Sequence, residues 1–596
     1  MEIDLKKKAQ QYIATGEFEK AETIYRELIS ISKIDHIVLN NLASVLMAMG
    51  KDQDGEVERL LKSSIDIKPD NSDAYNNLGN IYTNEGRLKA AIKAYKKAIE
   101  QKSNDYEIYF NLGNTYRKSK NNKSAINAYK ISLNLNPNYL PAINNIGICL
   151  KEEKKYNESI IFLKKAICLN KKDSEIYYNL GIVYKETGEI EKAINSYKIA
   201  IDLNPKYNQA LNNLGLIYLE QGNIKNAYSL IEKSIKINPA SSFSYNNIGS
   251  VYQEEGDLSS AKDSYVKAIK TNQDSPDSHW NLATTLLLMG EYEKGWEEYE
   301  WRLKTERANK LHTKPICKKW DGNEIQEDTE LLIIAEQGIG DTLHFMRYLK
   351  VLKSKYPKLK LCTQRNLHGL IKSSNIHPSP VSPEQGRLIS NTKWIPLLSI
   401  PKYLKVRKNH PVINEPYIKS RKDLNKKWKK KLSKENKPKI GINWQGNPLP
   451  DQGRLSTRSF PLEIFSEISK KIDCSLVSLQ KGYGSEQMNT CTFKNKFVSC
   501  QSEIDEIWDF EETAGIIENC DLIITCDTSV AHLAGGMGKE TWVLLKEVPE
   551  WRWGMDGNKT FWYPSMTLFR QTKKNDWESV IKEVLKKLVN IYNQTK

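Results

Sequence analysis

Apolar and small side chains recur along the first half of the chain with a fixed period. A Leu or Ile followed by Gly or Ala stands at Leu42, Leu78, Leu112, Ile146, Leu180, Leu214, Ile248 and Leu282, and the last seven are 34 residues apart. Alanine follows most of these pairs by 13 residues, at Ala91, Ala125, Ala193, Ala227 and Ala261. Small residues let two helices cross closely, and larger ones fill the groove between neighbours. The pattern predicts a stack of helix pairs, one pair per period.

The period and the residues at each position resemble the tetratricopeptide repeat. Prolines near the repeat ends, at Pro137, Pro205 and Pro239, belong to the same pattern. The segment GEFEKAETIYREL at residues 16–28 resembles the second helix of a first, incomplete copy. The resemblance implies an α-solenoid over residues 1–305 that binds a protein or peptide along its concave surface.

An asparagine precedes every Leu or Ile of the repeat pattern, which places it about 100° further round the helix, toward the interior of the superhelix. These residues are Asn41, Asn77, Asn111, Asn145, Asn179, Asn213, Asn247 and Asn281. A carboxamide both donates and accepts hydrogen bonds, so such a ladder can hold an extended peptide backbone without reading its sequence. The other interpretation is that the side chains make only local hydrogen bonds. The ladder resembles the one in protein O-GlcNAc transferases, which join such repeats to a glycosyltransferase.

From about residue 330 the pattern changes to short apolar runs that alternate with helical stretches. The runs are LLIIAE (331–336), LKLCTQ (359–364), PKIGINW (438–444), DCSLVSLQ (473–480), DLIITC (521–526) and TWVLL (541–545). Buried strands with helices between them predict parallel α/β sheets. The charged stretch 421–437 separates two groups of strands, so we expect two Rossmann-like lobes that face a cleft.

The expected domains follow from these patterns. We expect the repeats at 1–305, a connector at 306–328, a short first lobe at 329–425, a basic linker at 426–437, a second lobe at 438–575 and a C-terminal helix at 576–596. The last repeat continues into the aromatic segment GEYEKGWEEYEWRLK at 290–304. We expect this segment to pack the repeats onto the next domain rather than to bind a ligand.

The loop after the first strand carries an acid at the start of a helix. Ligands of parallel sheets bind at the carboxyl ends of the strands, so these loops are candidate sites. EQGIGD at 336–341 contains Gly338 and Gly340, but it matches neither the dinucleotide fingerprint nor the phosphate loop of nucleotide triphosphatases. Asp341 would repel phosphate, so this loop is built for something other than phosphate binding. One role open to Asp341 is a carboxylate that caps the helix.

The loop after the strand at 521–526 is the second candidate. Asp527, Thr528, Ser529 and His532 lie at the start of a helix, where unpaired N–H groups and the helix dipole favour an anionic ligand such as a diphosphate. The alternative is an ordinary helix cap formed by Asp527 or Thr528.

The segments GDTLH (340–344) and DTSVAHLA (527–534), each preceded by a strand, are similar to the family 9 glycosyltransferases, which include the bacterial heptosyltransferases. The resemblance covers about residues 325–575. It implies the GT-B fold of two Rossmann-like lobes, and inverting transfer of a sugar from a nucleotide-sugar donor without a metal or cofactor. The arrangement is closer still to bacterial proteins that join tetratricopeptide repeats to such a domain, which share KGWEEYEWR, SLQKG, PEWRWG and LFRQ.

The resemblance also implies roles for single residues. Asp341 would be the general base, and the loop from Asp527 to His532 would hold the donor diphosphate. Gly338 and Gly340 would let the backbone approach the acceptor or the sugar. The family carries a lysine after the first strand of the second lobe, where this chain has Arg454 and Arg458. Arg458 or Lys481 would then supply the positive charge.

Composition changes this picture little. The net charge of +16 suggests an acidic partner, but much of it lies in residues 421–439, which we interpret as a solvated helix or linker. No zinc-finger spacing or aromatic RNA-binding strand is present, so we expect no nucleic acid partner. The nine cysteines show no C-x-x-C pair and imply neither disulfides nor a metal site. Without a leader or a run of about 18 apolar residues, we expect no transmembrane segment and a cytoplasmic protein.

Two functions remain open from the sequence. The first is a glycosyltransferase whose repeats recruit a protein or glycan-carrier acceptor. The second is a non-catalytic repeat scaffold for protein–protein interaction with a degenerate glycosyltransferase domain. The residues Asp341, Asp527, Thr528 and His532 favour the first, whereas the missing lysine and the short first lobe allow the second.

Overall fold

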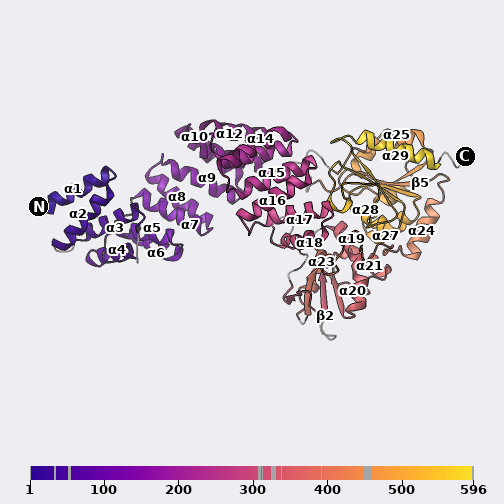
Figure 1. Ribbon diagram of the computed structural model, residues 1–596, viewed down its shortest axis with the longest axis horizontal. Coiled ribbons are helices and arrows are strands. Elements are labelled where there is room, and N and C mark those ends of the chain that lie inside the picture. The colour runs from indigo at the N-terminus through magenta and orange to yellow at the C-terminus, as the bar shows by residue number, and fades with distance from the viewer. Residues whose placement is uncertain are drawn as a thin grey trace. The chain divides into compact units, whose positions relative to one another are not determined.

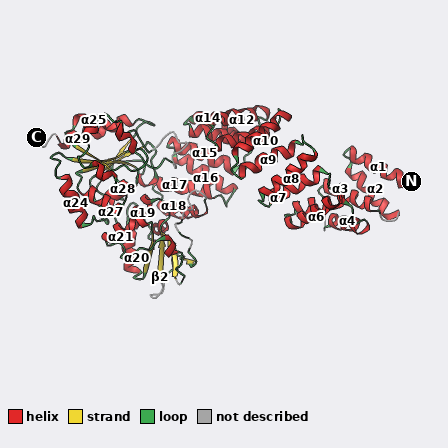
Figure 2. Ribbon diagram, turned by 180° about the vertical axis from the view of Figure 1, so that it is seen from behind, coloured by secondary structure: helices red, strands yellow, loops and turns green. Residues whose placement is uncertain are grey.

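The computed structural model describes residues 2–31, 35–51, 55–305, 311, 313, 315–323, 330–336, 338–390, 392–448 and 458–592. The chain divides into two compact units, Met1–Leu214 and Gly215–Lys596. The first unit consists of repeat helices, and the second contains further repeat helices and all the strands (Figures 1 and 2).

The repeat helices follow the predicted period. In chain order they are α1 (Glu2–Ala14), α2 (Phe18–Ile31), α3 (His36–Ala48), α4 (Glu56–Ile67), α5 (Ser72–Asn84), α6 (Leu88–Gln101), α7 (Tyr106–Lys118), α8 (Asn122–Leu135), α9 (Leu140–Glu152), α10 (Tyr156–Leu169), α11 (Ser174–Glu186), α12 (Ile190–Leu203), α13 (Asn208–Glu220), α14 (Ile224–Ile237), α15 (Ser242–Glu255), α16 (Leu258–Thr271), α17 (Pro276–Met289) and α18 (Tyr292–Tyr299). This confirms the predicted solenoid of tetratricopeptide-type helix pairs.

Close packing between the two helices of a repeat explains the Leu-Gly pairs. A Cβ added at Gly79 would lie 2.6 Å from the Tyr95 ring, and one added at Gly181 would lie 2.7 Å from the Tyr197 ring. Both tyrosine side chains are fully buried. Glycine on the first helix therefore makes room for the aromatic ring on the second, as the sequence pattern predicts.

The strands form two separate sheets in which every neighbouring pair is parallel. The first sheet has the order β1-β4-β2-β3 and the second has the order β6-β5-β7-β8-β9. The strands are β1 (Lys318–Lys319), β2 (Glu330–Ile334), β3 (Leu359–Cys362), β4 (Thr392–Pro396), β5 (Lys439–Asn443), β6 (Ser475–Ser478), β7 (Leu522–Cys526), β8 (Thr541–Leu545) and β9 (Met566–Arg570).

Helices cover both faces of the second sheet (Figure 1). Successive residues of β7 point to opposite faces: Ile524 packs with α25 (Ser466–Lys471) and α29 (Trp577–Tyr592), whereas Ile523 packs in the other core, which includes α27 (Phe510–Glu518) and α28 (Ser529–Gly536). This burial on two faces explains why the strands are continuous apolar runs.

The remaining helices pack around the two sheets. They are α19 (Ile339–Phe345), α20 (Leu349–Lys355), α21 (His368–Ser373), α22 (Pro383–Gly386), α23 (Ile400–Tyr403), α24 (Lys422–Leu432) and α26 (Gln501–Asp505). The basic stretch at 421–439, which we interpreted as a solvated helix or linker, therefore begins with the helix α24. Its exposed lysines surround Trp428, which is 1% exposed.

The six strands expected from the sequence are all present, and three further strands were missed. These are β1, β4 and β9. β1 falls in the expected connector 306–328 and pairs with β4, so this segment contributes to the first sheet; its other parts lie largely outside the described residues. The fold is a tetratricopeptide-type solenoid followed by an α/β region with two parallel sheets. None of the described helices is both long and apolar enough to cross a membrane.

Candidate functional site

A groove on the first unit is lined by the first helices of successive repeats. Its volume is about 970 Å³. The lining residues are Met47, Asn80, Thr83, Asn84, Tyr95, Asn111, Asn114, Arg117, Lys118, Lys120, Asn122 and Glu152. They come mainly from α3, α5, α7 and α9, so the groove runs across four consecutive repeats. Most of the lining residues have polar or charged side chains, three of them cationic and one acidic.

Two asparagines of the groove wall are held in a defined orientation. The Tyr95 hydroxyl donates to Asn80 Oδ1 at 2.7 Å, and the Tyr129 hydroxyl donates to Asn114 Oδ1 at 2.7 Å. Asn145 Nδ2 also donates to Asn114 Oδ1, at 2.9 Å. Because the oxygens face the protein, the opposite ends of these carboxamides are the ones available to the groove.

The asparagine ladder connects consecutive repeats. Seven of the eight amide nitrogens donate to the preceding repeat at 2.9 to 3.4 Å: Asn41 to Tyr25, Asn77 to Asn40 and Ser44, Asn111 to Asn76, Asn145 to Asn114 and Tyr129, Asn179 to Asn144, Asn213 to Tyr178 and Tyr197, and Asn281 to Asn246. The eighth asparagine, Asn247, is 8% exposed. These bonds commit the amide nitrogens to holding the stack together. Asn111 also lines the groove.

The second candidate site lies at the carboxyl ends of β5 and β7. Numbered along the chain, the second sheet has the order 2-1-3-4-5, and such sheets bind ligands where the strand order reverses, here between β5 and β7. Asn443 ends β5, and its Oδ1 accepts a 2.8 Å hydrogen bond from Thr528 Oγ1. Arg458 Nη1 donates to the Asp527 carbonyl at 3.2 Å. Thr528 is the N-cap residue of α28, and Ser529 is its first residue.

Gln480 fixes the loops that border this point. Its Oε1 accepts from Asn443 Nδ2 at 2.8 Å and from the Gln445 N–H at 3.0 Å, and its Nε2 donates to the Tyr483 carbonyl at 2.7 Å. The neighbouring Lys481 turns elsewhere, because its Nζ donates to the Ile504 carbonyl. Burial lowers the pKa of Lys481. The structure therefore brings Arg458 to the Asp527–His532 loop and leaves Lys481 engaged with another segment.

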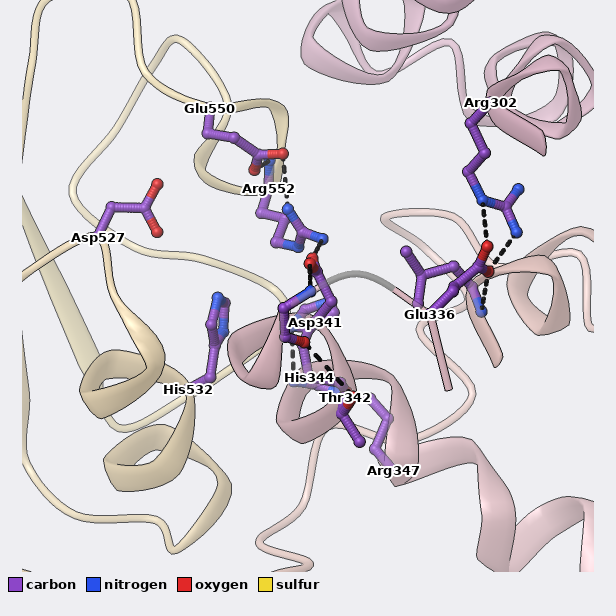
Figure 3. A network of polar contacts seen from close by, with 12 residues as sticks. Arg302, Glu336, Asp341, Thr342, His344, Arg347, Asp527, His532, Glu550 and Arg552 are labelled. Carbon is purple, nitrogen blue, oxygen red and sulfur yellow. Dashed lines mark hydrogen bonds and ion pairs between the residues drawn. The ribbon is translucent and has the colours of Figure 1, made fainter. Parts of the chain in front are cut away.

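Asp341 occupies the third position of α19, in the first lobe. Its Oδ2 accepts a 3.2 Å hydrogen bond from the Gly338 N–H, and its Oδ1 is paired with Arg552 of the second lobe (Figure 3). The Asp341 side chain is 20% exposed. A Cβ added at Gly340 would lie 3.2 Å from His532 Cδ2 and 3.5 Å from Ser529 Cα, so this glycine lets the starts of α19 and α28 approach closely.

Arg552 connects several acidic groups at this interface. Its Nη1 donates to Glu550 Oε1 at 2.6 Å and its Nη2 donates to Asp341, while the guanidinium lies 4.4 Å from the Trp551 ring centroid. Asp527 extends from the second lobe toward the same region (Figure 3). Burial raises the pKa of the Asp527 carboxyl, and the Arg458 and Arg552 charges oppose that rise.

A tyrosine hydroxyl joins histidines of α19 and α28. Tyr563 Oη lies 2.9 Å from His344 Nδ1, in α19, and 2.9 Å from His532 Nδ1, in α28. Burial lowers the pKa of both imidazoles well below the usual value, and the nearby Arg347 and Arg552 charges act in the same direction. The His532 ring also stacks on Trp553 at 5.6 Å between centroids.

A buried ion pair stands at the carboxyl end of β2. Arg302 Nη2 lies 2.5 Å from Glu336 Oε1, and both side chains are 0% exposed. Arg302 Nη2 also donates to Ser399 Oγ at 2.8 Å, and the Leu398 N–H donates to Glu336 at 3.2 Å. Burial raises the pKa of Glu336, whereas the Arg302 charge opposes the rise. Arg302 follows α18, so this pair ties the end of the repeats to the first sheet.

The aromatic segment 290–304 packs onto the α/β region, as the sequence predicts. Trp296 Nε1 donates to the Val406 carbonyl at 2.8 Å, and the Trp296 and Trp551 rings meet edge to face at 5.3 Å.

Several residues of these sites were not identified from the sequence. Arg552 lies within PEWRWG and His344 within GDTLH, and both segments were noted only as part of a resemblance. Asn80 and Asn114 had a detectable signal, because the equivalent positions of the next three repeats are Ile148, Ile182 and Leu216. Arg454 lies outside the described residues. Among the described residues no group of three His, Cys, Asp or Glu side chains is placed to hold a metal ion.

Comparisons with known proteins concern the repeats. A protein-family model described as the cilia and flagella-associated protein 70 C-terminal domain matches residues 39–279, and this match does not extend over the α/β region. No curated protein matches the chain.

Solved structures of repeat proteins also match. The MamA protein is 31% identical over 28% of this chain and 92% of its own, with a TM-score of 0.26. YrrB, described as a TPR protein with an unusual peptide-binding site, is 22% identical over 31% of this chain and 95% of its own, with a TM-score of 0.27. A tetratricopeptide repeat protein from Parabacteroides merdae is 19% identical over 42% of this chain and 98% of its own, with a TM-score of 0.37.

The period of 34 residues, the stacked helix pairs and the family match agree on the first part of the chain. The parallel sheets define the second part. The chain is therefore a tetratricopeptide-repeat protein in which the repeats are followed by an α/β region with two parallel sheets.

Proposed function

We propose that this chain is a protein-binding scaffold, in which the inner face of the repeats holds an extended segment of another protein. The observation that carries the proposal is the groove of about 970 Å³ across α3, α5, α7 and α9. Its carboxamides and cationic side chains offer hydrogen-bond donors to backbone carbonyls and acidic groups. Most of the asparagine ladder, in this account, stabilises the stack, and the groove residues make the contacts with the partner.

A selection of random peptides on the full chain tests this proposal. Asn84 is exposed and lines the groove, so Asn84→Trp fills the groove without disturbing the core. Lys89 is exposed on α6 and is not part of the groove lining, so Lys89→Trp is the matched control. We expect peptides selected on the wild type to bind Lys89→Trp equally and Asn84→Trp at least about tenfold more weakly, which corresponds to ~1.4 kcal/mol. Equal binding to both variants would contradict the proposal.

A second candidate function concerns the α/β region. The point of strand reversal between β5 and β7 favours a ligand there, and α28 begins beside it with Thr528 and Ser529. For glycosyl transfer, the amides at the start of α28 and Arg458 would hold the diphosphate of a nucleotide-sugar. Asp341 would take the proton of the acceptor hydroxyl as that oxygen attacks the anomeric carbon, and the nucleoside diphosphate would leave. For this role Asp341 would have to release Arg552 and bind the acceptor hydroxyl instead.

Thermal shifts with UDP-, GDP-, ADP- and dTDP-sugars test this second function. A ligand at 100 times its dissociation constant stabilises the domain that binds it by about 2.7 kcal/mol. We expect one nucleotide series to raise the unfolding temperature, and Asp341→Asn to abolish slow donor hydrolysis while retaining that shift. If no series raises it, the α/β region acts as a non-catalytic part of the scaffold, which is the alternative reading of the sequence.

A further inference from the structure

The turns between the two helices of each repeat provide an internal comparison. The first or second residue after the first helix adopts the left-handed conformation in nine successive turns. Seven of these residues are glycine, at Gly16, Gly50, Gly86, Gly188, Gly222, Gly256 and Gly290, with φ between 67° and 83°. The other two are lysine, Lys120 with φ of 60° and Lys154 with φ of 59°. Glycine is favoured at such a position because a Cβ clashes with the backbone there.

One of these lysines lies at the groove. Lys120 lines it together with Arg117 and Lys118, whereas Lys154 is not among the lining residues. Backbone strain of this kind is concentrated at functional sites, and of the two strained lysines only Lys120 lies at the groove. At position 120 that use is a positive charge at the edge of the groove, which a glycine would not provide.

The charged side chains and the oriented amides of the groove both favour ligand groups that are negatively charged or accept hydrogen bonds. The lining contains three cationic residues, Arg117, Lys118 and Lys120, and one acidic residue, Glu152; the Lys118 Nζ also donates to the Thr83 carbonyl at 2.5 Å. The carboxamide oxygens of Asn80 and Asn114 are occupied by tyrosine hydroxyls, so these side chains present their N–H groups. Cations and amide donors together favour acceptor groups with negative charge, and hydrogen bonds to charged groups are about twice as strong as neutral ones.

We propose that this groove binds an acidic peptide segment, whose aspartate and glutamate carboxylates pair with Arg117, Lys118 and Lys120. The backbone carbonyls of the same segment accept hydrogen bonds from Asn80 and Asn114. This inference rests on the proposed function of the repeats and specifies the chemistry of their partner. A peptide is favoured over a polyanion that lacks amide groups. The carboxamide N–H groups of the wall can donate to peptide carbonyls, in addition to the attraction between the cations and negative charge.

The two strained lysines supply a variant and its matched control. Lys120→Gly and Lys154→Gly each remove one positive charge and relieve the same backbone strain. Both should therefore raise the unfolding temperature of the first unit slightly and to a similar extent, as followed by far-ultraviolet circular dichroism. Only Lys120→Gly should weaken peptide binding. A variant that is more stable yet binds less well separates loss of function from loss of folding.

Fluorescence anisotropy with labelled peptides and the full chain tests the inference. The probes are a 12-residue peptide of repeated Asp-Glu-Gly, its neutral Asn-Gln-Gly counterpart, and a Ser-Gly peptide with phosphoserines. We expect the acidic peptide to bind at least about tenfold more tightly than the neutral one. We expect Lys120→Gly to weaken it about three- to tenfold and Lys154→Gly to leave it unchanged, with affinity falling as salt rises.

Three outcomes would overturn the inference. Equal binding of the acidic and neutral peptides would remove the role of charge. Equal weakening by both lysine variants would indicate diffuse attraction to a chain of net charge +16. Binding of the phosphoserine peptide alone would make the groove a phosphate site. If selected neutral peptides still lose affinity for Asn84→Trp, the groove remains the protein-binding surface and only the acidic specificity fails; if Asn84→Trp changes nothing, the proposed function fails as well.

Discussion

At the scale of single residues, the Tyr563 hydroxyl between His344 and His532 has one proton to give and two imidazole nitrogens within 2.9 Å. One imidazole must therefore carry a proton on Nδ1 and donate to the hydroxyl oxygen, while the other accepts from the hydroxyl. The accepting ring must be neutral, and the lowered pKa of each imidazole favours the neutral form of both rings. The chain of hydrogen bonds then holds α19 against α28.

The neutral histidines predict a pH dependence of stability. In the unfolded chain each imidazole titrates near its usual pKa of about 6.5, whereas in the folded protein it stays neutral to lower pH. The unfolded state therefore binds more protons below about pH 6.5, so the contribution to the free energy of unfolding is complete above that pH and is lost as pH falls. His532→Asn should reduce the slope of this loss by up to about 1.4 kcal/mol per pH unit.

Urea unfolding followed by tryptophan fluorescence between pH 5 and 7.5 measures this slope. His410 is exposed, and His410→Asn is measured beside His532→Asn as the same substitution at the surface. An unchanged slope in His532→Asn would mean that the buried imidazole does not stay neutral in the fold.

At the scale of elements, strand prediction worked for six apolar runs and missed β1, β4 and β9. The runs at β2, β5 and β7 are buried on two faces and stand out in the sequence. β4 contains Lys393 and Pro396 among its five residues, and β1 has only two residues, so neither has a periodicity to detect. These strands are fixed by their neighbours in the sheet rather than by their own composition.

Helix packing in the repeats was predictable because the same contact recurs every 34 residues. The polar interface of the α/β region was predictable only in part. Asp341 and His532 lie in recognisable loops, but Arg552 is 211 positions away from Asp341, and no local pattern pairs them. The groove was missed because its distinguishing residues, Asn80 and Asn114, depart from the repeat pattern rather than follow it.

The packing of helix pairs gives a prediction at this scale. Gly181→Ala would place a Cβ 2.7 Å from the Tyr197 ring, which is fully buried and has no room to move. Overpacking of this kind lowers stability by about 1–3 kcal/mol. Glu186→Ala on the same helix is exposed and should change stability by less than about 0.5 kcal/mol. Thermal unfolding followed by circular dichroism compares the two, and equal stabilities would contradict the close packing described for the repeats.

At the scale of the whole molecule, the second unit combines the last repeats with the α/β region through the Arg302–Glu336 pair. All 13 tryptophans lie after residue 214. Tryptophan fluorescence therefore reports on this unit alone, whereas circular dichroism also reports the helices of the first unit. The two signals can separate the unfolding of the two units within the intact chain.

The buried pair predicts how the second unit responds to substitution. Arg302→Met leaves the Glu336 carboxylate buried without its cation, which should cost about 3–5 kcal/mol. The double variant Arg302→Met/Glu336→Leu removes both charges and should recover most of this loss. The fluorescence transition should shift in the single variant, while the unfolding of the first unit stays where it is. An unshifted fluorescence transition would show that the repeats and the α/β region are not joined through this contact.

Photo-crosslinking of a bound peptide locates the protein-binding surface on the chain. A peptide selected on the full chain carries a benzophenone side chain, and mass spectrometry identifies the residues to which it becomes attached. We predict adducts on the groove, at α5, α7 and residues 118–122, and their loss in Asn84→Trp. Adducts confined to the second helices of the repeats or to the α/β region would contradict the account.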